Sequence, residues 1–98
     1  MIRHIFIGTF KENIDDATKA EELAALKAIK KKIPGVVALE ANFSTGWVGS
    51  ENSVVMTVDL ASKEDFDNYL AHPYHAEYLL KLGTENFSGY VAAQFELI

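Results

Sequence analysis

The sequence contains no cysteine, only two prolines and only one tryptophan in its 98 residues. Without cysteine the chain forms no disulfide bond, and this absence fits a protein that works in a reducing compartment. The first residues enter a strand-like run directly instead of forming a signal peptide, and no apolar stretch approaches the length of a membrane span. We therefore expect a cytoplasmic protein that does not associate with membranes.

Basic residues are also scarce: 9 lysines and arginines stand against 14 acidic residues, which gives a formal net charge of -5. A nucleic-acid-binding protein needs a basic face for the phosphates. The lysines that do cluster lie at the end of a predicted helix, where they complement the helix dipole: Lys27, Lys30, Lys31 and Lys32. We expect no nucleic-acid partner.

Apolar residues, in contrast, make up 49% of a chain that has the size of a single domain. We expect one domain over residues 1–98. A chain this short buries only about two thirds of the surface that its unfolded form exposes, so its core is thin. Burial against a partner subunit would therefore add to its stability.

The spacing of the apolar residues predicts four strands and three helices. The strands are expected at 2–10, 36–44, 54–60 and 87–97, and the helices at 17–32, 63–71 and 73–82. This order, β-α-β-β-α-α-β, predicts an α+β fold of the ferredoxin-like sandwich type, with a four-stranded antiparallel sheet.

The helix ends carry their own signals. Asp15, Asp16 or Thr18 can cap the first helix, and Ser62 can cap the second. The pair His72-Pro73 predicts a break at which a new helix begins, and Gly83 is a plausible C-cap for that helix.

The first predicted strand is apolar on both faces. His4, Phe6, Gly8 and Phe10 share one face, and Ile5 and Ile7 lie on the other. A strand of this kind is covered on both sides. We expect helices on the His4 face and a partner subunit on the Ile5 face.

Three segments together resemble the stress-responsive α/β-barrel domain family, called Dabb: Arg3-His4-Ile5, Ile33-Pro34-Gly35-Val36 and Tyr69-x-x-His72-Pro73-x-His75. Asn42 and Ser44 match the second strand of that family more loosely. The resemblance covers nearly the whole chain, and it implies a homodimer, a dimeric α/β barrel in which two four-stranded sheets combine.

The family includes stress-induced proteins without an assigned reaction, and it also includes olivetolic acid cyclase, a plant polyketide cyclase that needs no metal or organic cofactor. The residues that line the active cavity of that cyclase correspond to His4, Tyr69 and His75 here. Val54 stands where the cyclase has a further pocket histidine. The resemblance thus implies a catalytic set without a cofactor, and it does not carry over the long-chain substrate of the cyclase.

The same three residues suit proton abstraction next to a carbonyl group. His75 is the candidate general base because histidine titrates near neutrality, and Tyr69 is a candidate donor to the carbonyl oxygen. His4 would orient the substrate or share the proton relay. The alternative is that all three residues only hydrogen-bond each other or the backbone.

Aromatic side chains and a strand glycine are candidates for binding a small apolar or aromatic ligand: Phe6, Gly8, Phe10 and Phe66. Further aromatic candidates are Phe87 and Phe95. Core packing is the alternative for the aromatic residues, and a bulky neighbour is the alternative for Gly8. Trp47 lies in a predicted loop and is interpreted as a dimer contact or a pocket lid.

His72 and His75 form an H-x-x-H pair, but a zinc site normally needs three or four ligands and the spacing indicates no third. We therefore expect no metal and no cofactor. Three functions remain open: a cofactor-free cyclase or proton-transfer enzyme, a cofactor-independent monooxygenase, and a non-catalytic dimer that is stable or binds a ligand. A pocket that His4, Tyr69 and His75 reach would favour the first two, and a filled core would favour the third.

Overall fold

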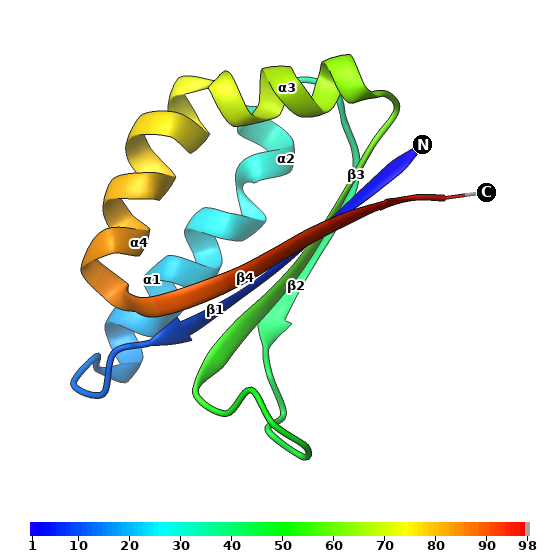
Figure 1. Cartoon of the computed structure of the whole chain (residues 1–98). Helices are drawn as coiled ribbons and strands as arrows, with labels where there is room; N and C mark the ends of the chain where they lie inside the picture. The colour runs from blue at the N-terminus through cyan, green and yellow to red at the C-terminus, as the bar shows by residue number, and fades with distance from the viewer. Residues whose placement is uncertain (98) are drawn as a thin grey trace.

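The computed structural model describes residues 1–97, in which one antiparallel sheet is covered by helices on a single face (Figure 1). The strand order in the sheet is β2-β3-β1-β4. The elements in chain order are β1 Ile2–Phe10, α1 Asp16–Lys27, α2 Ile29–Lys32, β2 Val36–Phe43, β3 Ser53–Leu60, α3 Lys63–Ala71, the π-helical η1 Tyr74–Leu79, α4 Leu80–Asn86 and β4 Phe87–Glu96.

The ferredoxin-like order and the four-stranded antiparallel sheet predicted from the sequence are confirmed. The first predicted helix is present, but it consists of two pieces, α1 and α2, that meet at Ala28. Its cap is Asp15, whose side chain accepts a hydrogen bond from the Thr18 amide. Ser62 caps α3 in the same way through the Asp65 amide.

The expected end of the last helix at Gly83 is wrong, because α4 continues through Gly83 to Asn86. A Cβ atom at Gly83 would lie 3.3 Å from the Phe87 ring. The glycine therefore allows the first residue of β4 to pack closely against α4. Close approach, and not helix termination, explains why a glycine stands at this position.

The His72-Pro73 break is confirmed. His72 is extended (φ -60°, ψ 137°) and ends α3, while Pro73 is helical and precedes η1. The missing amide of proline costs nothing at the start of a helix, where amides have no intrahelical partner. The break lets the chain change direction between Tyr69 and His75.

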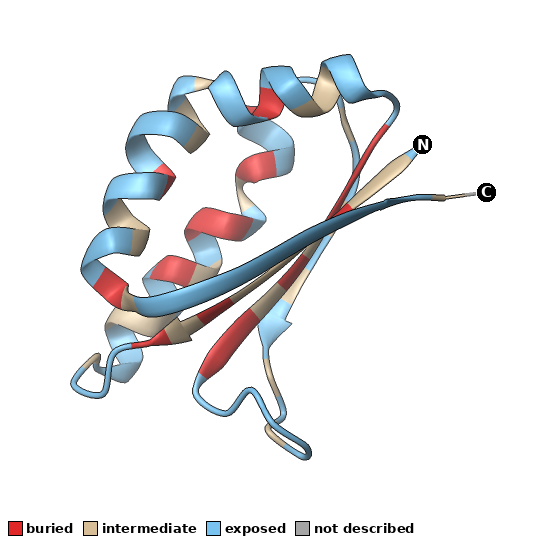
Figure 2. Cartoon of the chain, in the orientation of Figure 1, coloured by how far each residue is buried: buried red, intermediate tan, exposed pale blue. Residues whose placement is uncertain are grey.

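The helix-covered face of the sheet forms the core, and Figure 2 shows the buried positions gathered between the two layers. Val54, Met56, Val58 and Leu60 from β3 are buried against the helices. The register places their β1 partners, among them His4 and Phe6, on the same face.

The opposite face of the sheet has no covering layer within residues 1–97 (Figure 2). It carries apolar residues, among them Ile5 and its β4 neighbour Ala93, as well as Val91 and Phe95, which are 68% and 47% exposed. An ion pair between Arg3 and Asp59 (2.8 Å) lies at one end of this face. The alternation of β1 predicted from the sequence is therefore correct: one face meets the helices and the other is open.

Candidate functional site

A pocket of about 590 Å³ lies between the sheet and the helices α1, α3, η1 and α4. The middle of β1 and most of β4 form its floor, and the helices form its roof. Its walls are mainly apolar, and some lining residues carry polar groups: His4, Glu22, Tyr69, His75, Thr84, Ser88, Tyr90 and Gln94. An apolar cavity with a few convergent polar groups is typical of small-molecule sites.

The three residues selected from the sequence all line this pocket. The Tyr69 ring is close to both imidazoles, with its centroid 5.8 Å from that of His4 and 5.1 Å from that of His75. His4 comes from β1, which is far in sequence from the consecutive elements α3 and η1 that carry Tyr69 and His75. The folded chain therefore brings together the groups whose convergence the sequence predicts.

The ring of His75 is fixed by a backbone hydrogen bond. Its Nδ1 lies 3.0 Å from the carbonyl oxygen of Leu70, which can only accept, so Nδ1 carries the hydrogen. Burial lowers the pKa of His75, although the bond to Leu70 acts in the opposite direction. The neutral ring then has an unprotonated Nε2, which is the form that a general base needs.

His4 has the opposite arrangement. The Gln94 side-chain amide donates to Nδ1 of His4 over 3.0 Å, so the hydrogen of the neutral ring lies on Nε2. Burial lowers the pKa of His4, and the neighbouring His75 lowers it further. His4 is therefore a neutral hydrogen-bond donor at Nε2. The two histidines offer complementary groups to one pocket.

Tyr69 is almost fully enclosed, with 1% of its surface exposed. Burial raises the pKa of its hydroxyl, which therefore stays protonated and can donate a hydrogen bond. The hydroxyl has no hydrogen-bond partner among residues 1–97, whereas the hydroxyl of Tyr74 donates to the Ala25 carbonyl (2.7 Å). Tyr69 thus keeps its donor available to a ligand.

Two of the four predicted ligand-binding residues, Phe6 and Phe66, line the pocket, but Gly8 and Phe10 do not. A Cβ atom at Gly8 would lie 2.7 Å from the Phe87 ring, so the space above this glycine is filled by a neighbouring side chain. Phe10 is 3% exposed and packs in the core with its ring centroid 5.2 Å from that of Phe87. We correct both assignments to structural roles.

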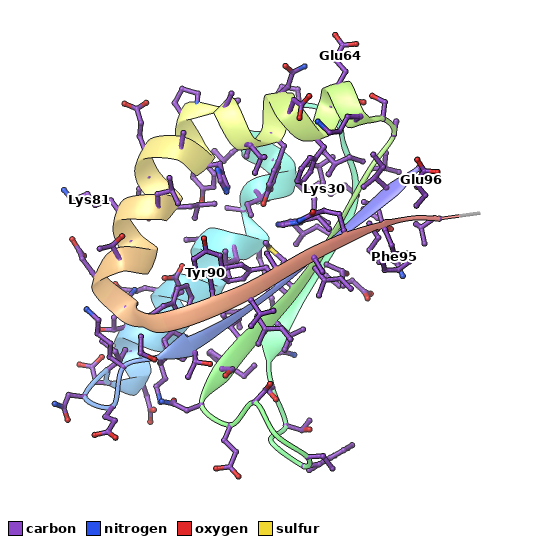
Figure 3. The ribbon with its side chains drawn as sticks, viewed as in Figure 1. Lys30, Glu64, Lys81, Tyr90, Phe95 and Glu96 are labelled. Atoms are coloured by element: carbon purple, nitrogen blue, oxygen red, sulfur yellow. The ribbon has the colours of Figure 1, made fainter. Side chains whose placement is uncertain are left out.

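The other aromatic candidates separate in the same way. Phe87 lines the pocket, whereas Phe95 belongs to the open face of the sheet. Figure 3 shows Tyr90 and Phe95 on opposite sides of β4, and Tyr90, not identified from the sequence, is the one on the pocket side. Trp47 is 87% exposed in the loop before β3 and does not line the pocket. Its interpretation as a lid of this pocket is not supported.

Gln94 and Glu22 also line the pocket, and neither is identified as a site residue from the sequence. Gln94 pairs with His4 across the β1–β4 ladder, a register that the sequence does not specify. Glu22 lies on a helix rich in charged residues, and only its burial distinguishes it from them. The alternation of β4 could have placed Gln94 on the pocket face, but no pattern in the sequence marks Glu22.

The two histidines of the H-x-x-H pair point to different partners. Nδ1 of His72 accepts from the Tyr74 amide (3.1 Å), while Nδ1 of His75 is bonded to Leu70. Within residues 1–97 no three histidine, aspartate or glutamate side chains are grouped as a metal site requires.

No helix within residues 1–97 is long and apolar enough to cross a membrane. A second hollow of about 610 Å³, at the β2 edge, contains none of the histidines.

Comparison with solved structures places the fold among enzymes and proteins of unknown function. A dimeric ferredoxin-like protein of unknown function from Thermobifida fusca has 23% identity, covers 98% of this chain and 90% of its own, and superposes with a TM-score of 0.85. Hydroxynitrile lyase from Passiflora edulis has 15% identity, with 96% and 90% coverage and a TM-score of 0.82.

An antibiotic biosynthesis monooxygenase superposes with a TM-score of 0.77 at 9% identity, and the match covers 100% of this chain and 99% of the monooxygenase. These likenesses show a shared fold. Comparison with curated protein sequences gives no significant match. The profile of the stress-responsive A/B barrel domain (Dabb), however, matches residues 2–97, which is nearly the whole sequence. The chain therefore belongs to the Dabb family of stress-responsive A/B barrel domains.

Proposed function

We propose that this protein is a cytoplasmic homodimer that binds a small, largely apolar or aromatic carbonyl compound and catalyses proton transfer next to the carbonyl group without a cofactor. One observation carries the proposal: two neutral histidines with opposite tautomers line one pocket together with a tyrosine whose ring is close to both. A protein whose core is filled would need no such pairing of an acceptor, Nε2 of His75, with a donor, Nε2–H of His4.

In the proposed reaction, Nε2 of His75 removes a proton from the carbon next to the carbonyl. Negative charge then develops on the carbonyl oxygen, where the Tyr69 hydroxyl and Nε2–H of His4 donate hydrogen bonds. Return of the proton to the same carbon gives exchange, and its return to another carbon gives isomerisation. Attack by the carbanion on a second carbonyl of the same molecule gives cyclisation: the new carbon–carbon bond turns that carbonyl oxygen into an alkoxide, which takes the proton from His75. His75 regains its neutral form in each case.

The dimer is supported by the open face of the sheet. Its β1 and β4 strands present Ile5, Val91, Ala93 and Phe95 together. A second copy of the same face would cover these side chains, and the solved relative from Thermobifida fusca is described as dimeric. Since a small domain has a thin core, burial of this face contributes to its stability.

The test uses 4′-pentylacetophenone, an aromatic ketone with exchangeable methyl hydrogens and an apolar tail. We expect the protein to bind it, as NMR shift changes at pocket residues, and to accelerate deuterium exchange of the methyl group in D2O. His75→Ala should slow the catalysed exchange by about a hundredfold or more. The matched control His72→Ala removes a histidine that does not line the pocket and should leave the exchange rate unchanged.

The two alternatives predict other results. A non-catalytic ligand-binding dimer would bind the ketone without catalysing exchange, and a cofactor-independent monooxygenase would consume oxygen with an aromatic substrate. The monooxygenase reading rests on the shared fold alone, which is a weak guide to chemistry. Binding without exchange in the wild type would therefore replace our proposal by the ligand-binding dimer.

A further inference from the structure

A carboxyl group lies in the wall of the same pocket and has no part in the proposed proton transfer. Glu22, from the middle of α1, is 1% exposed and lines the pocket together with Leu26 of the same helix. Its neighbour in sequence, Glu21, is exposed, as is usual for a glutamate on a helix. Burying a carboxyl group costs free energy unless hydrogen-bond partners compensate for the lost water. The partners of Glu22 therefore indicate its role.

Only one partner is present among residues 1–97. The Asn86 side-chain amide donates to Oε1 of Glu22 over 3.2 Å, and neither of the two ion pairs found there involves Glu22. No fully enclosed polar side-chain atom in this part of the chain lacks a partner. Oε2 of Glu22 is therefore not fully enclosed, and the cavity that Glu22 lines is the pocket. Burial raises the pKa of this carboxyl.

Glu22 lies at the other end of the pocket from the histidines. In the β1–β4 ladder, His4 pairs with Gln94 and Phe10 pairs with Phe87, the residue after Asn86. Positions 4 and 10 of one strand are roughly 20 Å apart, at about 3.3 Å per residue. The pocket wall between the two polar ends is apolar and includes Phe6, Leu79 and Phe87.

We propose that Glu22, held in place by Asn86, is a second polar anchor that binds a hydroxyl group at the far end of the ligand. The ligand would then be a carbonyl compound with an apolar middle and a terminal hydroxyl group. A hydroxyl donates to Oε2 without bringing a second charge into the enclosed space. This inference rests on the proposed function, because it assigns the other end of the same ligand.

A purely structural role for Glu22 is the competing explanation, because its bond to Asn86 ties α1 to α4. That role needs one oxygen and no access to the pocket. The two roles differ in what a substitution changes: a tie affects the stability of the fold, whereas an anchor affects the choice between ligands of the same size.

The experiment compares two probes with equal numbers of heavy atoms, 4′-pentylacetophenone and 4′-(4-hydroxybutyl)acetophenone, by calorimetric titration of the full chain. The quantity measured is the ratio of their Kd values, pentyl over hydroxybutyl. In Glu22→Leu we expect this ratio to fall about tenfold, the loss of one hydrogen bond to an ionisable group. The matched control Glu21→Gln should leave it unchanged.

Glu22→Gln keeps the size of the side chain and should fold even if the leucine variant does not, and its ratio should fall about threefold because an amide oxygen is a weaker acceptor. An unchanged ratio in a folded Glu22 variant, whatever its melting temperature, would return the residue to the structural role. Failure of both probes to bind would overturn the proposed function and this inference together. A ratio that falls as expected, without any exchange of methyl hydrogens, would support the anchor and reject only the proposed catalysis.

Discussion

Tyr69 and His75 face each other with ring centroids 5.1 Å apart, although one belongs to α3 and the other to η1. The last carbonyl groups of a helix lack an intrahelical partner, and the Leu70 carbonyl, near the end of α3, is bonded by Nδ1 of His75. The end of α3 thus selects the tautomer of the histidine that follows it. The helix break at Pro73 makes this contact possible.

Replacing Tyr69 with phenylalanine should separate catalysis from folding. The hydroxyl has no hydrogen-bond partner within residues 1–97, so its removal should change the free energy of unfolding by less than about 1 kcal/mol. The loss of an oxyanion donor should reduce the catalysed exchange rate by about a hundredfold. Urea unfolding and the deuterium-exchange assay measure the two effects. A large loss of stability with an unchanged rate would contradict this prediction.

Gly8→Ala should destabilise the fold by about 1–3 kcal/mol, because the added methyl group would lie 2.7 Å from the Phe87 ring. Gly89→Ala is the matched control, since a Cβ atom at that strand position meets nothing within 4 Å. Chemical denaturation of both variants gives the comparison. Equal stability of the two would show that Gly8 does not make room for Phe87.

Ile5→Asp should dissociate the proposed dimer, because the carboxylate would be buried without a partner when the open faces of two sheets meet. Sedimentation at micromolar concentration should give about twice the chain mass for the wild type and a lighter species for the variant. Val48→Asp, at a loop position that is 97% exposed, should leave the mass unchanged. A monomeric wild type would refute the dimer.

Acidification should destabilise the protein through its pocket histidines. Burial lowers the pKa values of His4 and His75 from about 6.5, so below that pH the unfolded chain binds more protons than the folded one. Their contribution to stability is therefore complete above about pH 6.5 and declines as the pH falls through that value. Urea unfolding at pH 7.5 and 5.5 should show a smaller difference in the double variant His4→Asn, His75→Asn than in the wild type. An equal pH dependence in both proteins would show that His4 and His75 do not cause the loss of stability.

The sequence by itself determined the order of strands and helices, the two-faced character of β1 and the break at His72-Pro73. Each of these follows from local physics: the alternation of a strand, the spacing of a helix, and the missing amide of proline. The extent of α4 beyond Gly83 was not determined in this way. A glycine can end a helix or make room for a neighbouring ring, and the sequence alone does not distinguish these two roles.

Only the tertiary structure decided how the candidate residues divide between pocket and core. Phe6 and Phe10 share one face of β1, yet Phe6 lines the pocket and Phe10 is enclosed in the core. The difference arises because the Phe87 ring packs over Gly8, between these two positions. The tautomers of His4 and His75 depend on partners from β4 and the end of α3. The hydrogen bond to the buried carboxyl of Glu22 comes from Asn86, which lies 64 residues further along the chain. Contacts between distant segments set these properties, and no local pattern in the sequence encodes them.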